Sequence, residues 1–216
     1  MFDFTESLRS ARARPPLAAA IAIAITAALS LAPPIRQWPV AQLAPLLVYL
    51  LLARLHGAFA LDARCFARGR PAWSLALLFA VVSITALALW LRMASPDLAA
   101  AMEHVPAMPM WLLPLAGLGF ELVNAALEEA LFRGIIYDRL RAAFGGGPWP
   151  HVLQASLFGL AHLYGVPSGL AGVVLAGAWA LGLSILRERS GGLLAPWLAH
   201  VAADIGVFAL LTVQAA

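Results

Sequence analysis

The sequence predicts an all-α protein that spans a membrane several times as a helical bundle. Hydrophobic residues make up 62% of the 216 residues and charged residues only 12%, roughly half of the about 25% found in soluble domains. Apolar runs close to the ~17–25 residues that a bilayer crossing needs recur along the chain. Ionisable residues lie inside several of these runs. Each of them costs at least ~2.5–3.5 kcal/mol at the bilayer centre, which marks it as a candidate functional residue.

The apolar runs predict seven membrane-spanning helices, at about residues 17–33, 39–53, 72–91, 110–131, 149–164, 169–186 and 192–213. The second and fifth are short for a full crossing, and fit a tilted, re-entrant or buried helix. Between the fourth and fifth spans, Ile135 to Phe144 predicts a short amphipathic helix on the inner membrane surface, with Arg139 and Arg141 toward the headgroups. The first run is long enough to remain as an anchor, so no cleavable signal peptide is expected.

The arginines predict that the N-terminus lies on the inner side of the membrane. All 14 basic residues are arginine, and positive charge is enriched in cytoplasmic loops. Only Arg36 and Arg92 would lie on the outer side, where residues 94–110 predict a surface connection. Because the arginines cluster at helix ends, no nucleic-acid partner is expected despite a net charge of +3. The inner arginines are Arg9, Arg12, Arg14, Arg54, Arg64, Arg68, Arg70, Arg133, Arg139, Arg141, Arg187 and Arg189.

The spans predict one integrated bundle with two parts. Residues 1–109 hold three spans and no motif, and residues 110–216 hold four spans that would form a catalytic core. The single cysteine, Cys65, excludes an internal disulfide and argues against a metal site built from a cysteine cluster.

The fourth span carries polar residues on two neighbouring faces. Glu121, Asn124 and Glu128 are spaced i, i+3, i+7 and therefore share one helix face, which predicts that they line a polar cavity. Glu129 is rotated by about 100° from Glu128. Arg133 follows Glu129 by four residues, which predicts an ion pair that neutralises both charges. The alternative is an ordinary inner helix end whose charges reach the headgroups.

The fifth and seventh spans carry the histidines. Gln154, Phe158 and His162 share a face of the fifth span at i, i+4, i+8. His200 and Asp204 are four residues apart in the seventh, so imidazole and carboxyl can touch and fix the tautomer of the ring. Each histidine could instead have a purely structural role. His162 could be a hydrogen-bonded packing residue, and His200 with Asp204 could form a polar contact that holds two helices together.

The three candidate residues Glu128, His162 and His200 lie at similar predicted depths. At 1.5 Å rise per residue they are roughly 8, 18 and 14 Å from the inner surface. We therefore expect them to meet in the inner half of the bilayer and to form one site.

The ordered motifs resemble those of a known family. Glu-Glu-x-x-x-Arg, Phe-x-x-x-His and His-x-x-x-Asn/Asp on successive membrane helices are similar to the CAAX-protease and bacteriocin-processing family of intramembrane endopeptidases, whose best-known branch is the type II CAAX prenyl endopeptidases. The resemblance covers about Glu121 to Asp204. It implies a glutamic-type intramembrane protease without a required cofactor.

The resemblance also implies roles for individual residues. Glu128 would activate the hydrolytic water as general base, and His162 would help to hold and polarise that water. His200 and Asp204 would stabilise the oxyanion. Many members have asparagine where this chain has Asp204, and an ionised aspartate cannot donate a hydrogen bond to an oxyanion. Asp204 would therefore have to be protonated, or act by orienting His200.

Supporting roles are implied for Glu129, Arg133 and Phe158, which also match the motifs. A glutamate at the position of Glu128, removed from water in a membrane bundle, would suit proton abstraction and return.

Three functions other than a glutamic-type protease could use the same residues. Glu128, His162 and His200 can supply the ligands of a His₂Glu zinc site, although no His-Glu-x-x-His motif is present. A proton-coupled transporter can use such residues as a relay, but the chain is short and shows no inverted repeat. A non-catalytic membrane adaptor that keeps the fold is the third.

The expected partners are the lipid bilayer and a membrane-associated protein or peptide substrate. The resemblance permits prenylated C-terminal tails, leader peptides of bacteriocins and C-terminal sorting anchors. The alanine and arginine usage, with no lysine, indicates a GC-rich bacterial genome and hence the bacterial inner membrane. Since bacteria mostly lack prenylated CAAX proteins, a leader or a sorting signal is the expected substrate.

Overall fold

The computed structural model describes residues 15–31, 39–55, 64–94, 108–109, 111–165 and 168–215. Within these ranges the chain forms helices and turns and no strand, which confirms the predicted all-α class. The arginines of the N-terminal segment and almost all of the predicted outer connection at 94–110 lie outside the described residues.

Each predicted span corresponds to one helix, with ends that differ by a few residues. The elements are α2 (Pro15–Leu31), α3 (Val40–Leu55), α4 (Trp73–Ala94), α6 (Leu113–Glu128), η3 (Glu129–Ile136), α7 (Tyr137–Phe144), α8 (Pro148–Ala161), η4 (His162–Tyr164), α9 (Gly169–Ser190) and α10 (Leu194–Ala215).

Among the described helices, α4 and α9 are long and apolar enough to cross a membrane, and Ala19–Ala28, Val40–Leu55 and Leu194–Leu210 are shorter apolar helices. Seven crossings therefore remain a prediction. The outer face of α4 is mostly apolar, with Leu77, Val81 and Leu89 each more than half exposed. A continuous exposed apolar face of this kind suits contact with lipid.

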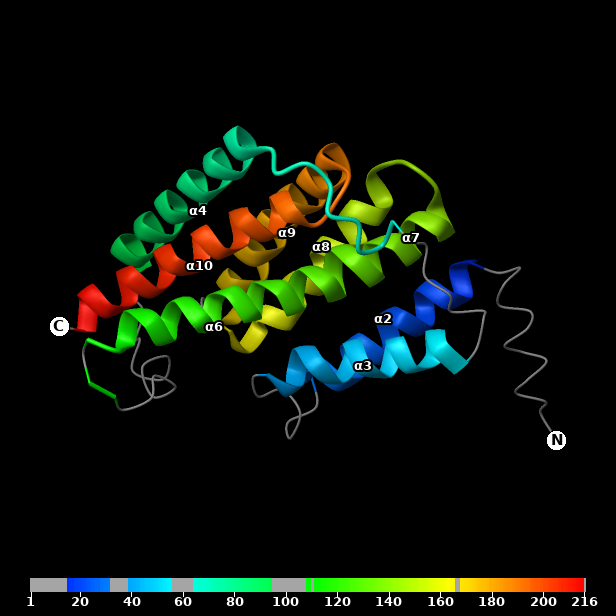
Figure 1. The fold of residues 1–216 in the computed structure, drawn as a ribbon, viewed down its shortest axis with the longest axis horizontal. Coiled ribbons are helices and arrows are strands. Elements are labelled where there is room, and N and C mark those ends of the chain that lie inside the picture. The colour runs from blue at the N-terminus through cyan, green and yellow to red at the C-terminus, as the bar shows by residue number, and fades with distance from the viewer. Residues whose placement is uncertain are drawn as a thin grey trace.

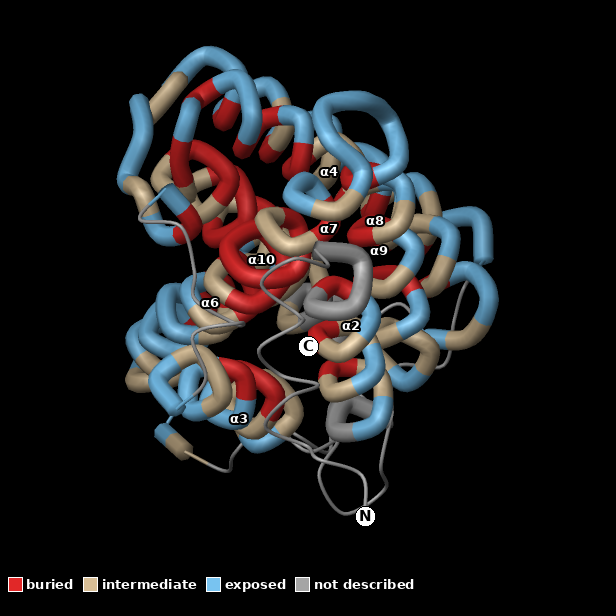
Figure 2. The backbone as a smooth tube through the Cα atoms, turned by 90° about the vertical axis from the view of Figure 1, so that its right-hand side faces the viewer, coloured by how far each residue is buried: buried red, intermediate tan, exposed pale blue. Residues whose placement is uncertain are grey.

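The helices pack as a bundle around α6 and α10 (Figure 1). α10 lies between α4 and α6, and α9 packs on α8. α2 and α3 pair with each other, and α2 lies along α7. Buried segments concentrate where α6, α8, α9 and α10 face one another (Figure 2). This arrangement brings the predicted motif helices together at the centre of the bundle.

The fourth span and the predicted surface helix form one continuous helix instead of two. A π-helical segment, η3, joins α6 to α7 from Glu129 to Ile136, so the prediction of a separate amphipathic helix beginning at Ile135 is wrong. Ile135 and Ile136 are fully buried, and the amphipathic part begins only at Tyr137. A π segment widens the helical turn and is often found at functional sites. Here it begins at the second glutamate of the Glu-Glu motif.

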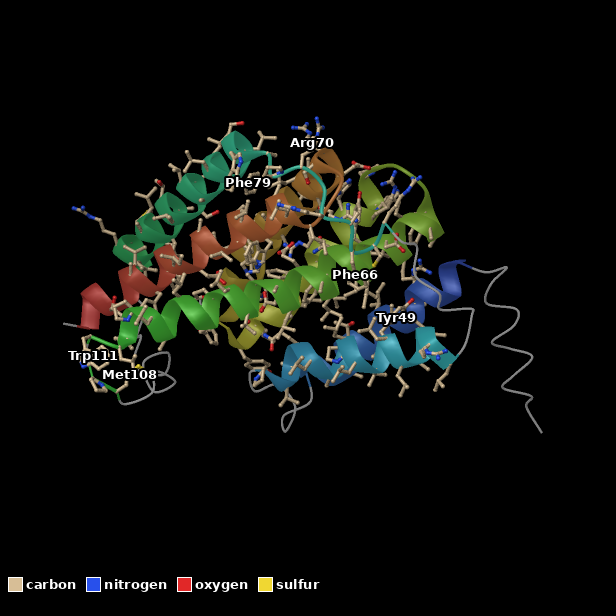
Figure 3. The ribbon with its side chains drawn as sticks, in the orientation of Figure 1. Tyr49, Phe66, Arg70, Phe79, Met108 and Trp111 are labelled. Carbon is tan, nitrogen blue, oxygen red and sulfur yellow. The ribbon has the colours of Figure 1, made fainter. Side chains whose placement is uncertain are left out.

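A strap formed by residues 64–72 ties the N-terminal helices to the turn between α9 and α10. The backbone N–H of Arg70 donates to the carbonyl of Ser190 at 2.9 Å, and Leu194 N–H donates to the carbonyl of Arg68 at 2.9 Å. Arg187 donates to the carbonyl of Arg64 at 2.6 Å. In Figure 3, Phe66 lies over the continuous α6–α7 helix and Arg70 at the outer edge near the end of α9.

Two glycines allow the strap and the turn to cross closely. A Cβ at Gly192 would lie 2.1 Å from the backbone nitrogen of Gly69, and a Cβ at Gly69 would lie 2.4 Å from the nitrogen of Gly192. Neither backbone can yield without breaking the hydrogen bonds around it, so only glycine fits at this crossing.

We predict that Gly192→Ala destabilises the protein, because the new Cβ would overlap the strap backbone. Overpacking of this kind costs typically about 1–3 kcal/mol, which should lower the apparent Tm in detergent by several degrees. Gly146→Ala is the matched control, since nothing lies within 4 Å of its Cβ position. Equal melting temperatures for the two variants would contradict the close crossing.

Candidate active site

His200 lies at the centre of a cluster of carboxylates contributed by two helices. Its Nδ1 is 2.7 Å from Oε1 of Glu129, and its Nε2 is 3.7 Å from Oε2 of Glu128 and 3.4 Å from Oδ2 of Asp204. The imidazole is only 2% exposed. The structure therefore brings three of the carboxylates singled out from the sequence onto one buried imidazole.

The two adjacent glutamates reach the same histidine from opposite edges of its ring. The sequence predicts that Glu128 and Glu129 point in different directions, with Glu129 engaged only by Arg133. Glu129 does pair with Arg133 at 3.0 Å, and both side chains are essentially unexposed. The same Oε1 of Glu129 also accepts from Nδ1 of His200. Glu129 thus fixes the imidazole tautomer and leaves Nε2 toward Glu128.

Asp204 lies in a second, connected group of polar side chains. Glu121 and Asn124 of α6 lie close enough to Asp204 to interact with it electrostatically. Asp204 is therefore held mainly by α6, and Nδ1 of His200 is oriented by Glu129 instead.

His162 joins the cluster through an aromatic ring. It begins the 3₁₀ turn η4 directly after α8, and its Nδ1 donates to the carbonyl of Phe158 at 3.0 Å. The Phe158 ring lies 4.5 Å from the ring of His162 and 6.3 Å from that of His200. The Arg133 guanidinium stacks on the same ring at 4.5 Å. Phe158 is thus the side chain that links the three motifs.

Gln42, which the sequence analysis did not select, belongs to the site. Its side-chain amide on α3 donates to Oε1 of Glu128 at 3.2 Å. Its own carbonyl oxygen is buried and has no hydrogen-bond partner among the described residues. A lone amide inside the apolar run at 39–53 was the signal available in the sequence, since a polar group in a membrane helix needs a partner.

Two tryptophans border the cluster. Trp179 of α9 meets the His200 ring edge-on at 4.6 Å between centroids and therefore packs between α9 and α10. The indole N–H of Trp197 donates to the carbonyl of Leu122 at 3.2 Å and pins α10 to α6.

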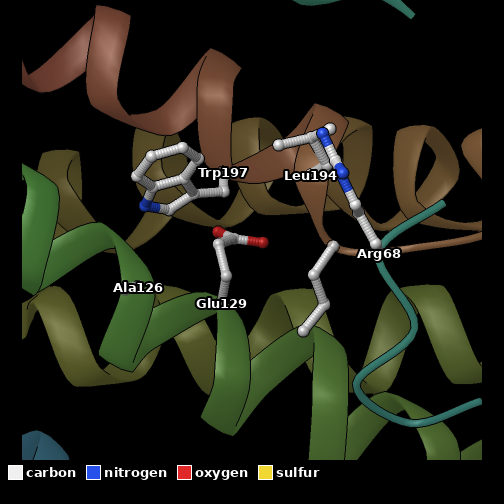
Figure 4. Close-up of a pocket in the computed structure, with 6 residues that line it drawn as sticks. Arg68, Ala126, Glu129, Leu194 and Trp197 are labelled. Carbon is white, nitrogen blue, oxygen red and sulfur yellow. The ribbon is translucent and has the colours of Figure 1, made fainter. Parts of the chain in front are cut away.

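A cavity of about 310 Å³ opens beside Glu129 (Figure 4). The Glu129 carboxylate faces Trp197 across it. Glu121, Asn124 and Glu128 do not line this cavity, so the polar cavity expected at these three residues stays a prediction. The cavity is lined by Arg68, Ala126, Glu129, Leu193, Leu194 and Trp197.

The described residues include no group of three or more His, Cys, Asp or Glu side chains that could hold one metal ion. Glu128, His162 and His200, the ligands considered for zinc, are all described. His162 contacts Phe158 and its Nδ1 is engaged with a backbone carbonyl.

A separate group of polar side chains, formed by a serine, a histidine and a glutamate, lies between α8 and α9, away from the Glu-Glu motif. Nδ1 of His151 is 2.8 Å from Oγ of Ser184, and its Nε2 is 3.2 Å from Oε2 of Glu188. Ser184 is fully buried and its hydroxyl donates to the carbonyl of Leu181 at 2.8 Å. A hydroxyl engaged in this way is not a nucleophile exposed to substrate, so we assign this group to holding α8 against α9.

Residues 109–206 match the family model described as type II CAAX prenyl endopeptidase Rce1-like. The match covers a little under half of the chain and contains all the motifs on which the resemblance was based. No curated protein and no solved structure matches the chain.

We predict that Gln42→Leu lowers kcat for peptide cleavage about tenfold with little change in KM, because Glu128 loses a donor. A hydrogen bond to a charged group contributes ≈ 1.5–3 kcal/mol. Gln42→Glu places a second carboxylate beside Glu128 and should lower kcat at least as much, since an ionised carboxylate cannot donate a hydrogen bond to Glu128.

Thr26→Val is the control for these variants. Thr26 is a buried polar residue of α2 whose hydroxyl donates within its own helix to Ala22 at 2.9 Å. If Gln42→Leu and Thr26→Val gave the same kcat, Gln42 would have no part in positioning Glu128.

Proposed function

We propose that this chain is a glutamic-type intramembrane endopeptidase, since residues 109–206 match the Rce1-like model of type II CAAX prenyl endopeptidases, a family of membrane-embedded proteases. Its substrate would be a membrane-associated protein or peptide, and its location the bacterial inner membrane with the N-terminus inside.

The observation that carries the proposal is the placement of His200 between Glu128 and Glu129. Hydrolysis of a peptide bond needs a base for water, stabilisation of the oxyanion and a proton for the leaving amine. Glu128 has one oxygen held by Gln42 and the other toward His200, which leaves lone pairs available for a water molecule.

In the proposed reaction, Glu128 takes a proton from water as the oxygen attacks the substrate carbonyl. His162 holds the same water with its Nε2, because its Nδ1 is already engaged with the backbone. The oxyanion of the tetrahedral intermediate lies near the Asp204 group and near Nε2 of His200, which donates to it from the doubly protonated ring while Nδ1–H stays on Glu129. Glu128 then returns the proton to the amide nitrogen, the C–N bond breaks, and a carboxylic acid and an amine are released.

Glu129 and Arg133 support this chemistry without touching the substrate carbonyl. Their buried ion pair holds Nδ1 of His200 as a hydrogen-bond donor, so that Nε2 is presented in one orientation. Phe158 and Trp179 exclude water from the back of the imidazole. A low-dielectric surrounding of this kind strengthens the electrostatic interactions on which oxyanion stabilisation depends.

The substrate proposed from the sequence is a leader peptide or a C-terminal sorting anchor rather than a prenylated tail. The bundle suits such substrates, because its described outer faces are apolar and the site lies between helices.

We predict that Glu128→Gln abolishes cleavage of a co-expressed substrate, with a loss of at least about 10³-fold in kcat, since the amide cannot accept the proton of water. Glu188→Gln is the matched control. Glu188 contacts His151 and Arg141 and takes no part in the site. Cleavage by Glu128→Gln at the rate of Glu188→Gln would refute the glutamic mechanism.

Chelation separates this mechanism from the zinc alternative. If Glu128 activates the water without a metal, the purified protein should keep its cleavage rate to within about twofold of the untreated value after prolonged treatment with EDTA and 1,10-phenanthroline. A zinc enzyme would lose activity and regain it when zinc is restored. The measurement is the cleavage rate before treatment, after treatment and after zinc addition, with the metal content of the same samples determined.

A further inference from the structure

The cluster around His200 holds more carboxyl groups than cations. Among the described residues, the only cations within ion-pairing distance of these carboxyl groups are Arg133 and His200 itself, when its ring is doubly protonated. Arg133 pairs with Glu129, and His200 lies beside Glu128, which must be ionised to act as a base. Two carboxyl groups therefore remain without a cation of their own. The four carboxyl groups are those of Glu121, Glu128, Glu129 and Asp204.

The helices α6 and α10 pack side by side and run in opposite directions (Figure 1). Gly117 of α6 faces Phe208 of α10, since a Cβ at Gly117 would lie 2.9 Å from that ring. Four residues further along α6 and four residues back along α10, about one turn of each helix, lie Glu121 and Asp204. The packing of the two helices therefore sets these two carboxyl groups opposite each other, where they interact electrostatically.

The pair formed by Glu121 and Asp204 retains at least one proton. Neither residue pairs with an arginine in the described part of the chain. Asp204 lies 3.4 Å from Nε2 of His200, but Glu128 approaches the same nitrogen at 3.7 Å. Two neighbouring carboxyl groups removed from water do not both ionise, because each negative charge disfavours the other and burial penalises both. A proton shared by the pair satisfies this constraint without a further cation.

Asp204 is the member of the pair that can reach the reacting atoms. Its side chain is 20% exposed and lies beside the imidazole of His200, whereas Glu121 is only 7% exposed and makes no ion pair with that ring. An oxyanion that develops near Asp204 favours the shared proton on this residue. A protonated carboxyl group can then donate its O–H to the oxyanion, which an ionised one cannot do.

We propose that Glu121 is a positioning residue that keeps Asp204 protonated, so that Asp204 donates a hydrogen bond to the oxyanion of the tetrahedral intermediate. Asp204 keeps its proton during the reaction, and Glu128 remains the group that takes the proton of water and returns it. Glu121 lies seven residues before the Glu-Glu motif and belongs to none of the motifs. The inference rests on the proposed protease function and adds to it a residue that acts through Asp204.

The test is a cycle of two conservative substitutions, Glu121→Gln and Asp204→Asn, made alone and together. Glutamine has the size of glutamate but no negative charge, so Asp204 loses the neighbour that disfavours its ionisation. Asparagine at position 204 is always neutral, and its amide N–H can donate a hydrogen bond. The full chain in detergent micelles is assayed for kcat and KM with a fluorescence-quenched acylated peptide. Glu188→Gln is the control, because Glu188 contacts His151 and Arg141 outside the site.

Glu121→Gln should lower kcat about 10²-fold with little change in KM, as expected when one oxyanion donor is lost. Asp204→Asn should lower kcat only severalfold, since its amide still donates. The double variant should match Asp204→Asn and be more active than Glu121→Gln alone, because a neutral asparagine does not depend on Glu121. Glu188→Gln should behave as wild type. A purely structural role of Glu121 would lower activity whether position 204 is aspartate or asparagine.

Infrared spectroscopy detects the shared proton without a substrate. At neutral pH, the difference spectrum between the wild type and the double variant should contain the C=O stretching band of a protonated carboxyl group, which moves to lower frequency in D₂O. Glu121→Gln alone should also lose this band, whereas Glu188→Gln should keep it. In Asp204→Asn the band should be lost or shifted, which tests the pair without altering Glu121.

Two results would overturn the inference: no band of a protonated carboxyl group in the wild type, or a double variant no more active than Glu121→Gln. The proton and the cleavage reaction fail separately. A band that depends on Glu121, without any cleavage of peptide by the wild type, would refute the protease proposal and leave the protonated pair intact. Cleavage by a wild type that lacks the band would do the reverse.

Discussion

The buried ion pair of Arg133 with Glu129 is the constraint on which the rest of the site depends. Both side chains are essentially inaccessible, and removing each ion from water costs several kcal/mol. The pair is therefore tolerable only when other groups surround it. Phe158 stacks on the guanidinium, and His200 donates to the carboxylate. The requirement to satisfy these two charges draws η3, α8 and α10 to one point, which is where the candidate chemistry lies.

The π segment explains how neighbouring glutamates serve one imidazole. In a regular α-helix the side chains of Glu128 and Glu129 diverge by about 100°. The two nitrogens of the imidazole lie on different edges of the ring. The helix changes from α to π between Glu128 and Glu129. Glu129 therefore reaches Nδ1 while Glu128 reaches the side of Nε2. One carboxylate fixes the ring, and the other is left with lone pairs for water.

The sequence predicted the contacts that lie within one helix and few of those between helices. The pairs Glu129–Arg133 and His200–Asp204 follow from a spacing of four residues, because helical geometry alone sets their distance. The bond between Gln42 and Glu128 joins residues 86 positions apart. This bond depends on how α3 packs against α6. Hydrophobic periodicity does not predict which helices pack against each other. The ends of most helices were predicted to within a few residues, because the apolar runs end where the helices end, whereas the π segment left no compositional signal.

The part of the chain outside the family match shapes the site as much as the part within it. The matched segment, residues 109–206, contains every motif residue and thus the candidate chemistry. Gln42 holds Glu128 from α3, the strap fixes the turn before α10, and Arg68 lines the cavity beside Glu129. These contacts position the candidate catalytic groups and form part of the walls around them. Divergence in the N-terminal helices can therefore change which peptides enter the site, while the carboxylates and histidines stay the same.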